Sequence, residues 1–319
     1  MKRKVLSKRY ENLFFKLMIA AILWALLSAP ARAASFEEFV TPTPDSSPAD
    51  IAIDSKGNIW FTEINANKIG KLVPSEAEPG TSKGITEYDV PEAKGKPYFI
   101  MVASNDKVYF SELAGNKIGQ LDPTTGKIKE FAIPTPKSEP HNMREDEHGN
   151  IWFVEFEGQK IGKLDPATGA IKEYRIKEGY PHDLTLVDGK VWYTMGGKFW
   201  AQIIYYKIGA LDMQTGELTE LEIQPKKSTP HGITKGADGT IWFSLHFGKK
   251  ISRLDFSKGH PPAVVNYDIG NRVQTPHDLV VDDKRGWIWF TDDHGSLIGR
   301  LDISKAKPDT AEGFDIFKI

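Results

Sequence analysis

The chain has 319 residues, of which 40% are hydrophobic, and it contains 41 Lys and Arg against 43 Asp and Glu. This composition is typical of an ordered globular protein and excludes a disordered or collagen-like chain. The absence of cysteine excludes disulfides, zinc–thiolate sites, iron–sulfur clusters and a cysteine nucleophile. The length allows two ordinary domains, but a single all-β domain can also be this long.

The N-terminal segment predicts a secretory signal peptide. Basic residues precede an 11-residue apolar run at Leu17–Leu27, and Ala31 and Ala33 are the small residues that a signal peptidase reads. A membrane anchor is the alternative, but the run is shorter than the roughly 20 residues that a spanning helix needs. We therefore expect cleavage after residue 33, a folded domain at residues 34–319, and a secreted or periplasmic protein.

Removal of this segment changes the charge of the protein. Residues 1–33 hold seven basic residues and one acidic residue, so the remainder has 34 basic and 42 acidic residues, a net charge of −8. A net acidic surface offers no basic footprint for nucleic acid and disfavours attachment to an anionic membrane. We expect neither partner, and we expect a monomer.

The rest of the chain is a repeat, marked by an aromatic pair that recurs at intervals of 49, 43, 40, 50 and 47 residues. The pairs are Trp60-Phe61, Tyr109-Phe110, Trp152-Phe153, Trp192-Tyr193, Trp242-Phe243 and Trp289-Phe290. These six copies nearly fill the chain after the signal peptide, which indicates one repeat architecture. The recurring Trp residues are expected to pack between neighbouring repeats.

Each copy contains four short β-rich runs separated by Asp, Pro and Gly turns, which is typical of hairpins. In the third copy the expected strands are Asn142–Glu145, Ile151–Glu155, Lys160–Leu164 and Ile171–Ile176. The pattern predicts an all-β fold with negligible helix. The expected architecture is a single β-propeller of six four-stranded antiparallel blades, with seven blades as the alternative.

Two segments are candidates for the outermost strand of the last blade. Phe36–Val40 precedes the first copy, Phe314–Lys318 ends the chain, and both resemble an outermost strand. We expect Phe36–Val40 to close the ring, but one of the two is surplus and the sequence does not say which.

Polar residues recur at two positions that should share one face of the propeller. The first is a Pro-His pair at the start of the innermost strand, which predicts four imidazoles facing one another at one channel mouth: His141, His182, His231 and His277. In the first two copies Asp50, or a near neighbour, and Tyr98 take the place of the histidine.

The second position is the end of the next strand, occupied by Glu63, Glu112, Glu155, Met195, His246 and Asp292-Asp293-His294. Imidazoles and carboxylates that converge on one axis can be metal ligands or general acids and bases. The alternative is structural, because a repeated histidine can cap a strand and a repeated glutamate can anchor a loop.

The fourth copy carries an apolar, aromatic insertion at Met195–Tyr206, which includes Trp200. It lies between the second and third strands, on the face of the expected site. We expect a lid over the channel, with a contact surface as the alternative.

Repeats such as SEPHNMREDEHGNIWFVEFEGQKIGKLDPATGAIKEY and STPHGITKGADGTIWFSLH resemble those of the virginiamycin B lyase (streptogramin B lyase) family, over residues 36–303. The resemblance implies a propeller that binds one Mg²⁺ near its axis. It also implies cleavage of a C–O bond by elimination, which opens a cyclic ester without water. By this resemblance the catalytic histidines start the innermost strands of the last two repeats, at His231 and His277, and His141 and His182 are further candidates.

The resemblance also implies two metal-binding carboxylates, one two residues before the last such histidine and one at the end of its second strand. Here the first position is Thr275 and the second is best matched by Asp293. The family's Glu-Pro-His appears in the third repeat, at Glu139-Pro140-His141, with Glu155 fourteen residues on. The candidate Mg²⁺ ligands are therefore Asp293, Glu155 and Glu139. Six copies are fewer than the seven blades usual in the family.

Two classes of function remain open. The first is a metal-dependent lyase, or a lactonase-type hydrolase, that acts on a small-molecule ester with His277 as general base and His231 as partner or acid. The second is a non-catalytic propeller that presents the same face to a ligand or a protein. The sequence leaves the substrate and the metal open.

Overall fold

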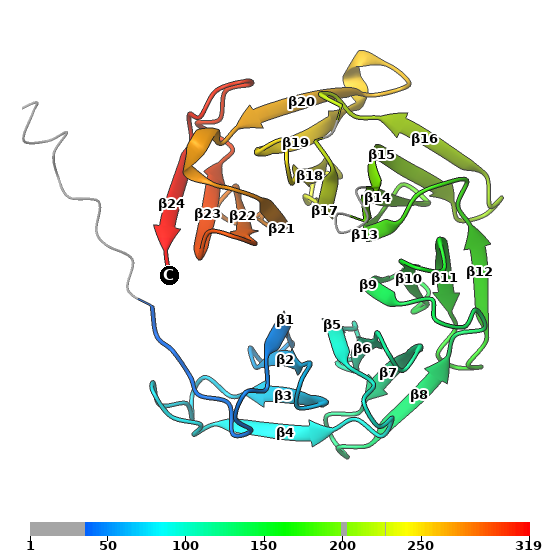
Figure 1. The fold of residues 1–319 in the computed structure, drawn as a ribbon, viewed down its shortest axis with the longest axis vertical. Coiled ribbons are helices and arrows are strands. Elements are labelled where there is room, and N and C mark those ends of the chain that lie inside the picture. Colours follow the sequence, from blue (N-terminus) through cyan, green and yellow to red (C-terminus); the bar gives the residue numbers. More distant parts are fainter. Residues whose placement is uncertain (1–35, 199–202, 227) are drawn as a thin grey trace, which may run out of the picture. The chain divides into compact units, whose positions relative to one another are not determined.

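The computed structural model describes residues 36–198, 203–226 and 228–319, and Glu38–Ile319 form one compact unit. Within these ranges the chain forms 24 strands in six antiparallel sheets of four, each sheet in simple chain order (Figure 1). This confirms the predicted six-bladed propeller. The predicted signal peptide and Trp200 lie outside the described ranges.

The strand bounds follow the repeat. The first three blades contain β1 (Pro48–Ile53), β2 (Ile59–Glu63), β3 (Lys68–Leu72), β4 (Ile85–Asp89), β5 (Pro97–Val102), β6 (Val108–Glu112), β7 (Lys117–Leu121), β8 (Ile128–Ala132), β9 (Pro140–Glu145), β10 (Ile151–Glu155), β11 (Lys160–Leu164) and β12 (Ile171–Arg175). The last three contain β13 (Pro181–Val187), β14 (Lys190–Lys198), β15 (Ile203–Asp212), β16 (Leu218–Glu222), β17 (Pro230–Lys235), β18 (Ile241–Leu245), β19 (Lys250–Asp255), β20 (Ala263–Asp268), β21 (Pro276–Asp282), β22 (Trp287–Asp292), β23 (Leu297–Asp302) and β24 (Phe314–Lys318).

Helix is confined to two short 3₁₀ turns in the described part of the chain, Phe256–Lys258 and Gly270–Arg272. A search of the described residues finds no helix with the length and apolarity needed to cross a membrane.

The second aromatic residue explains a glycine in the adjacent strand in five of the six pairs; in the fifth blade Phe243 instead faces Ser252. Phe153 pairs with Gly162 across β10 and β11, and a Cβ built on Gly162 would lie 2.1 Å from the Phe153 ring. A larger residue at this glycine would therefore displace the ring. The same close approach joins Phe61 to Gly70, Phe110 to Gly119, Tyr193 to Gly209 and Phe290 to Gly299.

The first aromatic residue packs toward the next blade, as predicted. Trp60 shares a buried cluster with Ile100 and Phe110 of the second blade. Trp242 of the fifth blade shares one with Ile288 and Phe290 of the sixth. These clusters supply the apolar burial that holds successive blades together.

Hydroxyl groups add a second link between blades. The Oγ1 of Thr62 donates to the carbonyl of Tyr98 at 2.8 Å. The hydroxyls of Thr194 and Ser244 donate in the same way to the carbonyls of His231 and His277. In each case the donor lies on the second strand of one blade and the acceptor lies at the start of the next blade's innermost strand.

The sixth blade is completed by β24, which pairs with β23. The expectation that Phe36–Val40 closes the ring was wrong: residues 36–40 form no strand, and the Val40 amide donates to the carbonyl of Thr81 within the first blade. The reason is that β24 already occupies the outer edge of β23. The C-terminal segment therefore completes the last blade.

The first and sixth blades do not pack on each other as the others do. Neighbouring innermost strands contact one another from β1 to β21, whereas β21 and β1 make no comparable contact among the described residues (Figure 1). Apolar side chains of β1 and β21 are therefore exposed to solvent: Ile51 is 66% exposed, Ile53 is 65% exposed and Val280 is 60% exposed. The described residues thus leave one blade face uncovered at each end of the array.

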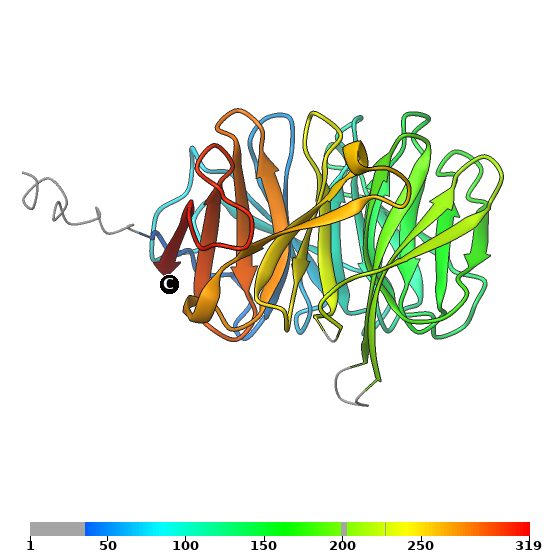
Figure 2. The same cartoon turned by 90° about the horizontal axis from the view of Figure 1, so that it is seen from above.

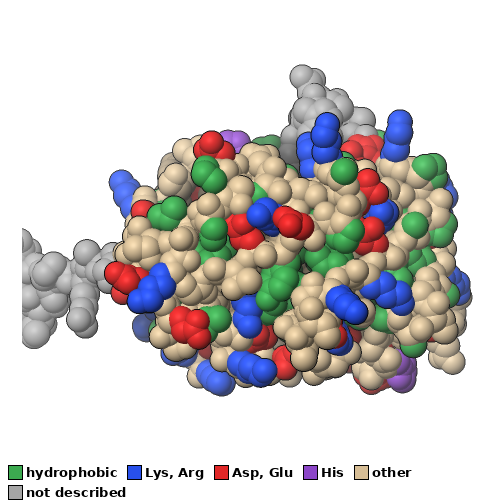
Figure 3. Space-filling model, turned by 90° about the horizontal axis from the view of Figure 1, so that it is seen from below, with side chains coloured by type: hydrophobic (Ala, Val, Ile, Leu, Met, Phe, Trp, Pro, Cys, Tyr) green, Lys and Arg blue, Asp and Glu red, His purple; other side chains and the backbone are tan. Residues whose placement is uncertain are grey.

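The predicted insertion extends the hairpin of β14 and β15, which projects beyond the other loops at one end of the blades (Figure 2). On the side shown in Figure 3, acidic, basic and hydrophobic side chains are interspersed. That side shows no extended basic patch.

Candidate functional site

The start of each innermost strand meets the end of the second strand, so the two recurring polar positions lie at the same end of the blades. Pro276 pairs with Asp292, and the register then shifts before Leu279. The same irregularity follows Pro48, Pro97, Pro181 and Pro230. A bulge re-aims side chains locally, and here it places the side chains of the consecutive residues His277 and Asp278 side by side.

The four predicted histidines form a row along adjacent innermost strands. Ring centroids are 6.2 Å apart for His141 and His182, 4.5 Å for His182 and His231, and 3.8 Å for His231 and His277. We expected the imidazoles to face one another across the channel, but these contacts run between neighbouring blades. Phe156, which the sequence did not single out, stacks on His141 at 4.9 Å.

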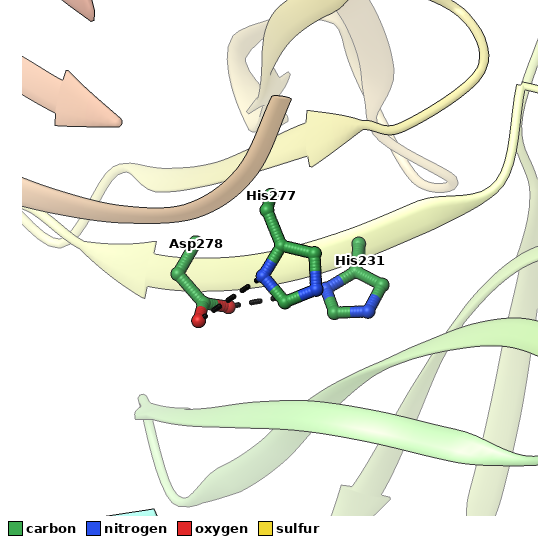
Figure 4. A group of neighbouring side chains, drawn as sticks. All are labelled: His231, His277 and Asp278. Atoms are coloured by element: carbon green, nitrogen blue, oxygen red, sulfur yellow. Dashed lines mark ion pairs between the residues drawn. The ribbon is translucent and has the colours of Figure 1, made fainter. Parts of the chain in front are cut away.

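His231, His277 and Asp278 form a close polar cluster (Figure 4). The Nδ1 of His277 lies 3.3 Å from Oδ2 of Asp278, and the Nδ1 of His231 lies 3.8 Å from Oδ1 of the same carboxylate. The side chain of Asp278 is 41% exposed and that of His277 is 22% exposed. A small molecule at the channel mouth can therefore reach this cluster.

The four histidines differ in pKa because only His277 has a close carboxylate partner of its own. Burial lowers the pKa of His141 to about 3 and that of His182 to about 4, and it holds the pKa of His231 well below its ordinary value. Burial also acts against His277, but the ion pair with Asp278 outweighs it and raises the pKa of His277. The site thus combines His277, whose pKa is raised, with His231, whose pKa is lowered.

Asp278 was not identified from the sequence, because the aspartates at the same position in two other blades have a structural role. Asp50 and Asp183 each accept the backbone N–H of the next blade's innermost strand, at Ile100 (3.0 Å) and Ile233 (2.9 Å). No comparable blade contact follows β21, and Oδ1 of Asp278 is buried without a hydrogen-bond partner. The Pro-His-Asp sequence at residues 276–278 marks Asp278 as a candidate, but the same sequence at residues 181–183 contains the structural Asp183, so the motif alone does not reveal the role.

The structure also refines two repeat positions. The residue aligned with the histidines in the first blade is Ala49, since Pro48 pairs with Glu63 as Pro276 pairs with Asp292. His246 and Asp293 lie one residue beyond their strands, which end at Leu245 and Asp292.

The glutamates at the strand ends belong to the interior of the protein. Glu63, Glu112 and Glu155 are fully buried, and their carboxyl oxygens have no hydrogen-bond partner. Burial raises the pKa of Glu112 and of Glu155 to about 8. Asp292 instead accepts the backbone N–H groups of Gln274 and Thr275. Glu155 therefore resembles a neutral structural group more than a metal ligand.

The donor set does not fit the Mg²⁺ that the resemblance implies. Mg²⁺ prefers oxygen ligands in octahedral geometry. Among the described residues, the groups of three or more potential ligands within 4.8 Å are His231, His277 and Asp278, and His246, Asp293 and His294. Neither group includes Glu139 or Glu155, and each holds two imidazoles and one carboxylate.

The fold and the site together define a β-propeller whose channel mouth carries an imidazole–carboxylate cluster suited to acid–base chemistry. The sequence profile of the Virginiamycin B lyase family matches residues 30–254, and the chain belongs to this family.

Solved structures agree with this assignment. The chain is similar to a streptogramin B lyase structure, with 32% identity, a TM-score of 0.76, and 89% of this chain and 86% of that chain covered. It is also similar to virginiamycin B lyase from Staphylococcus aureus, with 30% identity, a TM-score of 0.73, and 88% and 86% covered. A search of curated proteins found no match.

Proposed function

We propose that the protein is an exported carbon–oxygen lyase that opens an ester or cyclic ester by elimination. The observation that carries the proposal is the His231–His277–Asp278 cluster in a chain of this family. A catalytically inactive His-to-Ala variant of virginiamycin B lyase with quinupristin, 30% identical to this chain, supports a histidine as the reacting group. The signal-peptide pattern of residues 1–33 supports export.

In the proposed step, neutral Nε2 of His277 removes a proton from the carbon next to the one that carries the ester oxygen. The electron pair of that C–H bond forms a C=C bond, the C–O bond breaks, and the ester oxygen leaves with its electrons as a carboxylate. Asp278 holds Nδ1 of His277 at 3.3 Å and stabilises the imidazolium that forms. No water is consumed.

His231 acts as the neutral partner in this step. Its ring lies 3.8 Å from that of His277, and its low pKa keeps it uncharged. An uncharged imidazole can donate a hydrogen bond to the substrate without repelling the imidazolium of His277. We assign it the positioning of the ester rather than the transfer of the proton.

The test uses quinupristin as substrate and mass spectrometry of the product. Elimination leaves the mass of the ring-opened product unchanged, whereas hydrolysis adds the mass of one water. His277→Ala should lower turnover at least ~100-fold, and Asp278→Asn should lower it as well. His148→Ala is the matched control, because His148 is 74% exposed in a turn of the third blade.

Turnover that gains one water, or turnover that is unchanged in His277→Ala, would contradict the proposed mechanism. Saturable binding of quinupristin to the wild type without any product would assign the protein to the alternative class of binding propellers.

A further inference from the structure

A second cluster of side chains lies beside the proposed catalytic residues. His246, Asp293 and His294 each offer one ligand atom, and these atoms lie within 4.8 Å of one another. The His246 ring is 5.5 Å from that of His231 and 5.8 Å from that of His277. The two clusters are therefore neighbours at one channel mouth but share no residue.

The repeat brings these residues together. His246 follows β18 and Asp293 follows β22, so they occupy the same repeat position in consecutive blades. The His246 amide donates to the carbonyl of Thr229 at 2.9 Å, and the Asp293 amide donates to that of Thr275 at 3.1 Å. These equivalent backbone bonds fix both residues at the same height along neighbouring blades.

An outer layer of contacts orients the exposed histidine. The Thr275 hydroxyl lies 3.1 Å from Nδ1 of His294, and Asp292 accepts the amide of Thr275 at 2.9 Å. The Asp293 carboxylate, which is one of the three potential ligands and not part of this outer layer, lies 3.3 Å from the same nitrogen. Metal-binding histidines are commonly held by such outer hydrogen bonds, and Thr275 stands where the family resemblance leads one to expect a glutamate.

We propose that His246, Asp293 and His294 bind a divalent transition-metal ion, with Zn²⁺ as the test ion, in place of Mg²⁺. Two imidazole nitrogens and one carboxylate suit zinc or iron better than magnesium. One side of the site faces solvent, since the side chains of Asp293 and His294 are 47% and 63% exposed. That side leaves room for water or a substrate oxygen on the metal. The site goes beyond the proposed lyase reaction and does not depend on turnover.

The test measures metal binding by the full-length mature protein after removal of bound metal with a chelator. Isothermal titration should show one Zn²⁺ per chain, bound at least ~100-fold more tightly than Mg²⁺. His294→Ala should weaken Zn²⁺ binding at least ~10-fold, and Thr275→Val should weaken it to a smaller extent. His246→Ala should act like His294→Ala. Because His246 is buried, the exposed His294 is the safer variant if His246→Ala fails to fold.

Two controls keep the readout specific. His148→Ala should leave Zn²⁺ affinity unchanged, because His148 is exposed in a distant turn. His277→Ala should also retain Zn²⁺ binding. Loss of Zn²⁺ in His277→Ala with retention in His294→Ala would overturn the proposal and assign the metal to the His231–His277–Asp278 cluster. A preference for Mg²⁺ would also overturn it. Failure of the lyase reaction would leave this measurement unaffected.

Discussion

The last blade and the interior blades are built from the same repeat, yet they use its residues differently. Trp242 packs against the sixth blade and is 4% exposed. Trp289, at the same repeat position, is only half-buried. The hydroxyl of Ser244 is buried against the next blade, whereas Thr291 is exposed. In an interior blade these repeat residues pack against the next blade. In the last blade the equivalent residues make no such contact among the described residues.

This comparison explains why the site lies where it does. In the first and fourth blades the Asp of the innermost strand accepts a backbone amide of the next blade, Asp50 from Ile100 and Asp183 from Ile233. In the last blade Asp278 instead forms an ion pair with His277. A group that is structural elsewhere in the ring thus becomes available for chemistry at its end.

The largest effect that would test this comparison concerns the paired tryptophans. Trp242→Ala should lower the free energy of unfolding by about 3–5 kcal/mol, because it opens a cavity between two packed blades. Trp289→Ala should cost about 1–2 kcal/mol, since no blade covers that ring. Urea unfolding of both variants measures the difference. Equal losses would show that the outer face of the last blade is covered in solution.

A second test uses the buried glutamate of an interior blade. Burial raises the pKa of Glu112 to about 8, above its ordinary value of 4.5, so the folded protein holds a proton that the unfolded chain releases. The contribution of Glu112 to stability should therefore fall as pH rises from about 4.5 to about 8, by an amount on the order of 5 kcal/mol.

Glu112→Gln should remove this pH dependence and make the protein more stable than the wild type at pH values above about 8. The measurement is the unfolding free energy at several pH values across that window, with exposed Glu147→Gln as the matched control. A wild-type protein whose stability rises between these pH values, relative to Glu112→Gln, would show that the carboxyl is ionised and paired in the fold.

The smallest expected difference concerns the hydroxyl links. Ser244→Ala removes a buried hydroxyl that bonds the His277 carbonyl and accepts the Gly232 amide, and it should cost about 1–2 kcal/mol. Thr291→Ala removes a hydroxyl that accepts the Asp278 amide at 3.2 Å, but this bond is exposed to water, so stability should change by less than about 0.5 kcal/mol. Thermal unfolding distinguishes them, and a larger loss for Thr291→Ala would reverse the comparison.

Most of the fold could be predicted from the sequence because the repeat is local. The third blade shows this well, since the expected strands Ile151–Glu155 and Lys160–Leu164 coincide with β10 and β11. The choice between the two terminal segments could not be predicted, because it depends on which one reaches the edge of β23. Pairing with β23 depends on the three-dimensional arrangement of the chain, and the local sequence pattern of either segment does not report it.

The site could be predicted only in part. The Pro-His pairs located His231 and His277, since both start an innermost strand. The sequence placed His246 and Asp293 at the ends of their strands, but the strands end one residue earlier. The sequence pattern does not show where strand pairing stops. The role of Asp278 depends on the absence of a packed neighbour, and no local sequence feature reports that absence.

The hydroxyl links described above have a consequence for how such a protein can be rebuilt. The carbonyls of His231 and His277 are held by Thr194 and Ser244 of the preceding blades. The position of each imidazole is thus set by residues on both sides of a blade boundary. A segment transplanted or duplicated with its site intact must run from the second strand of one blade through the first strand of the next. A cut at the visible repeat boundary would separate each histidine from the group that aligns it.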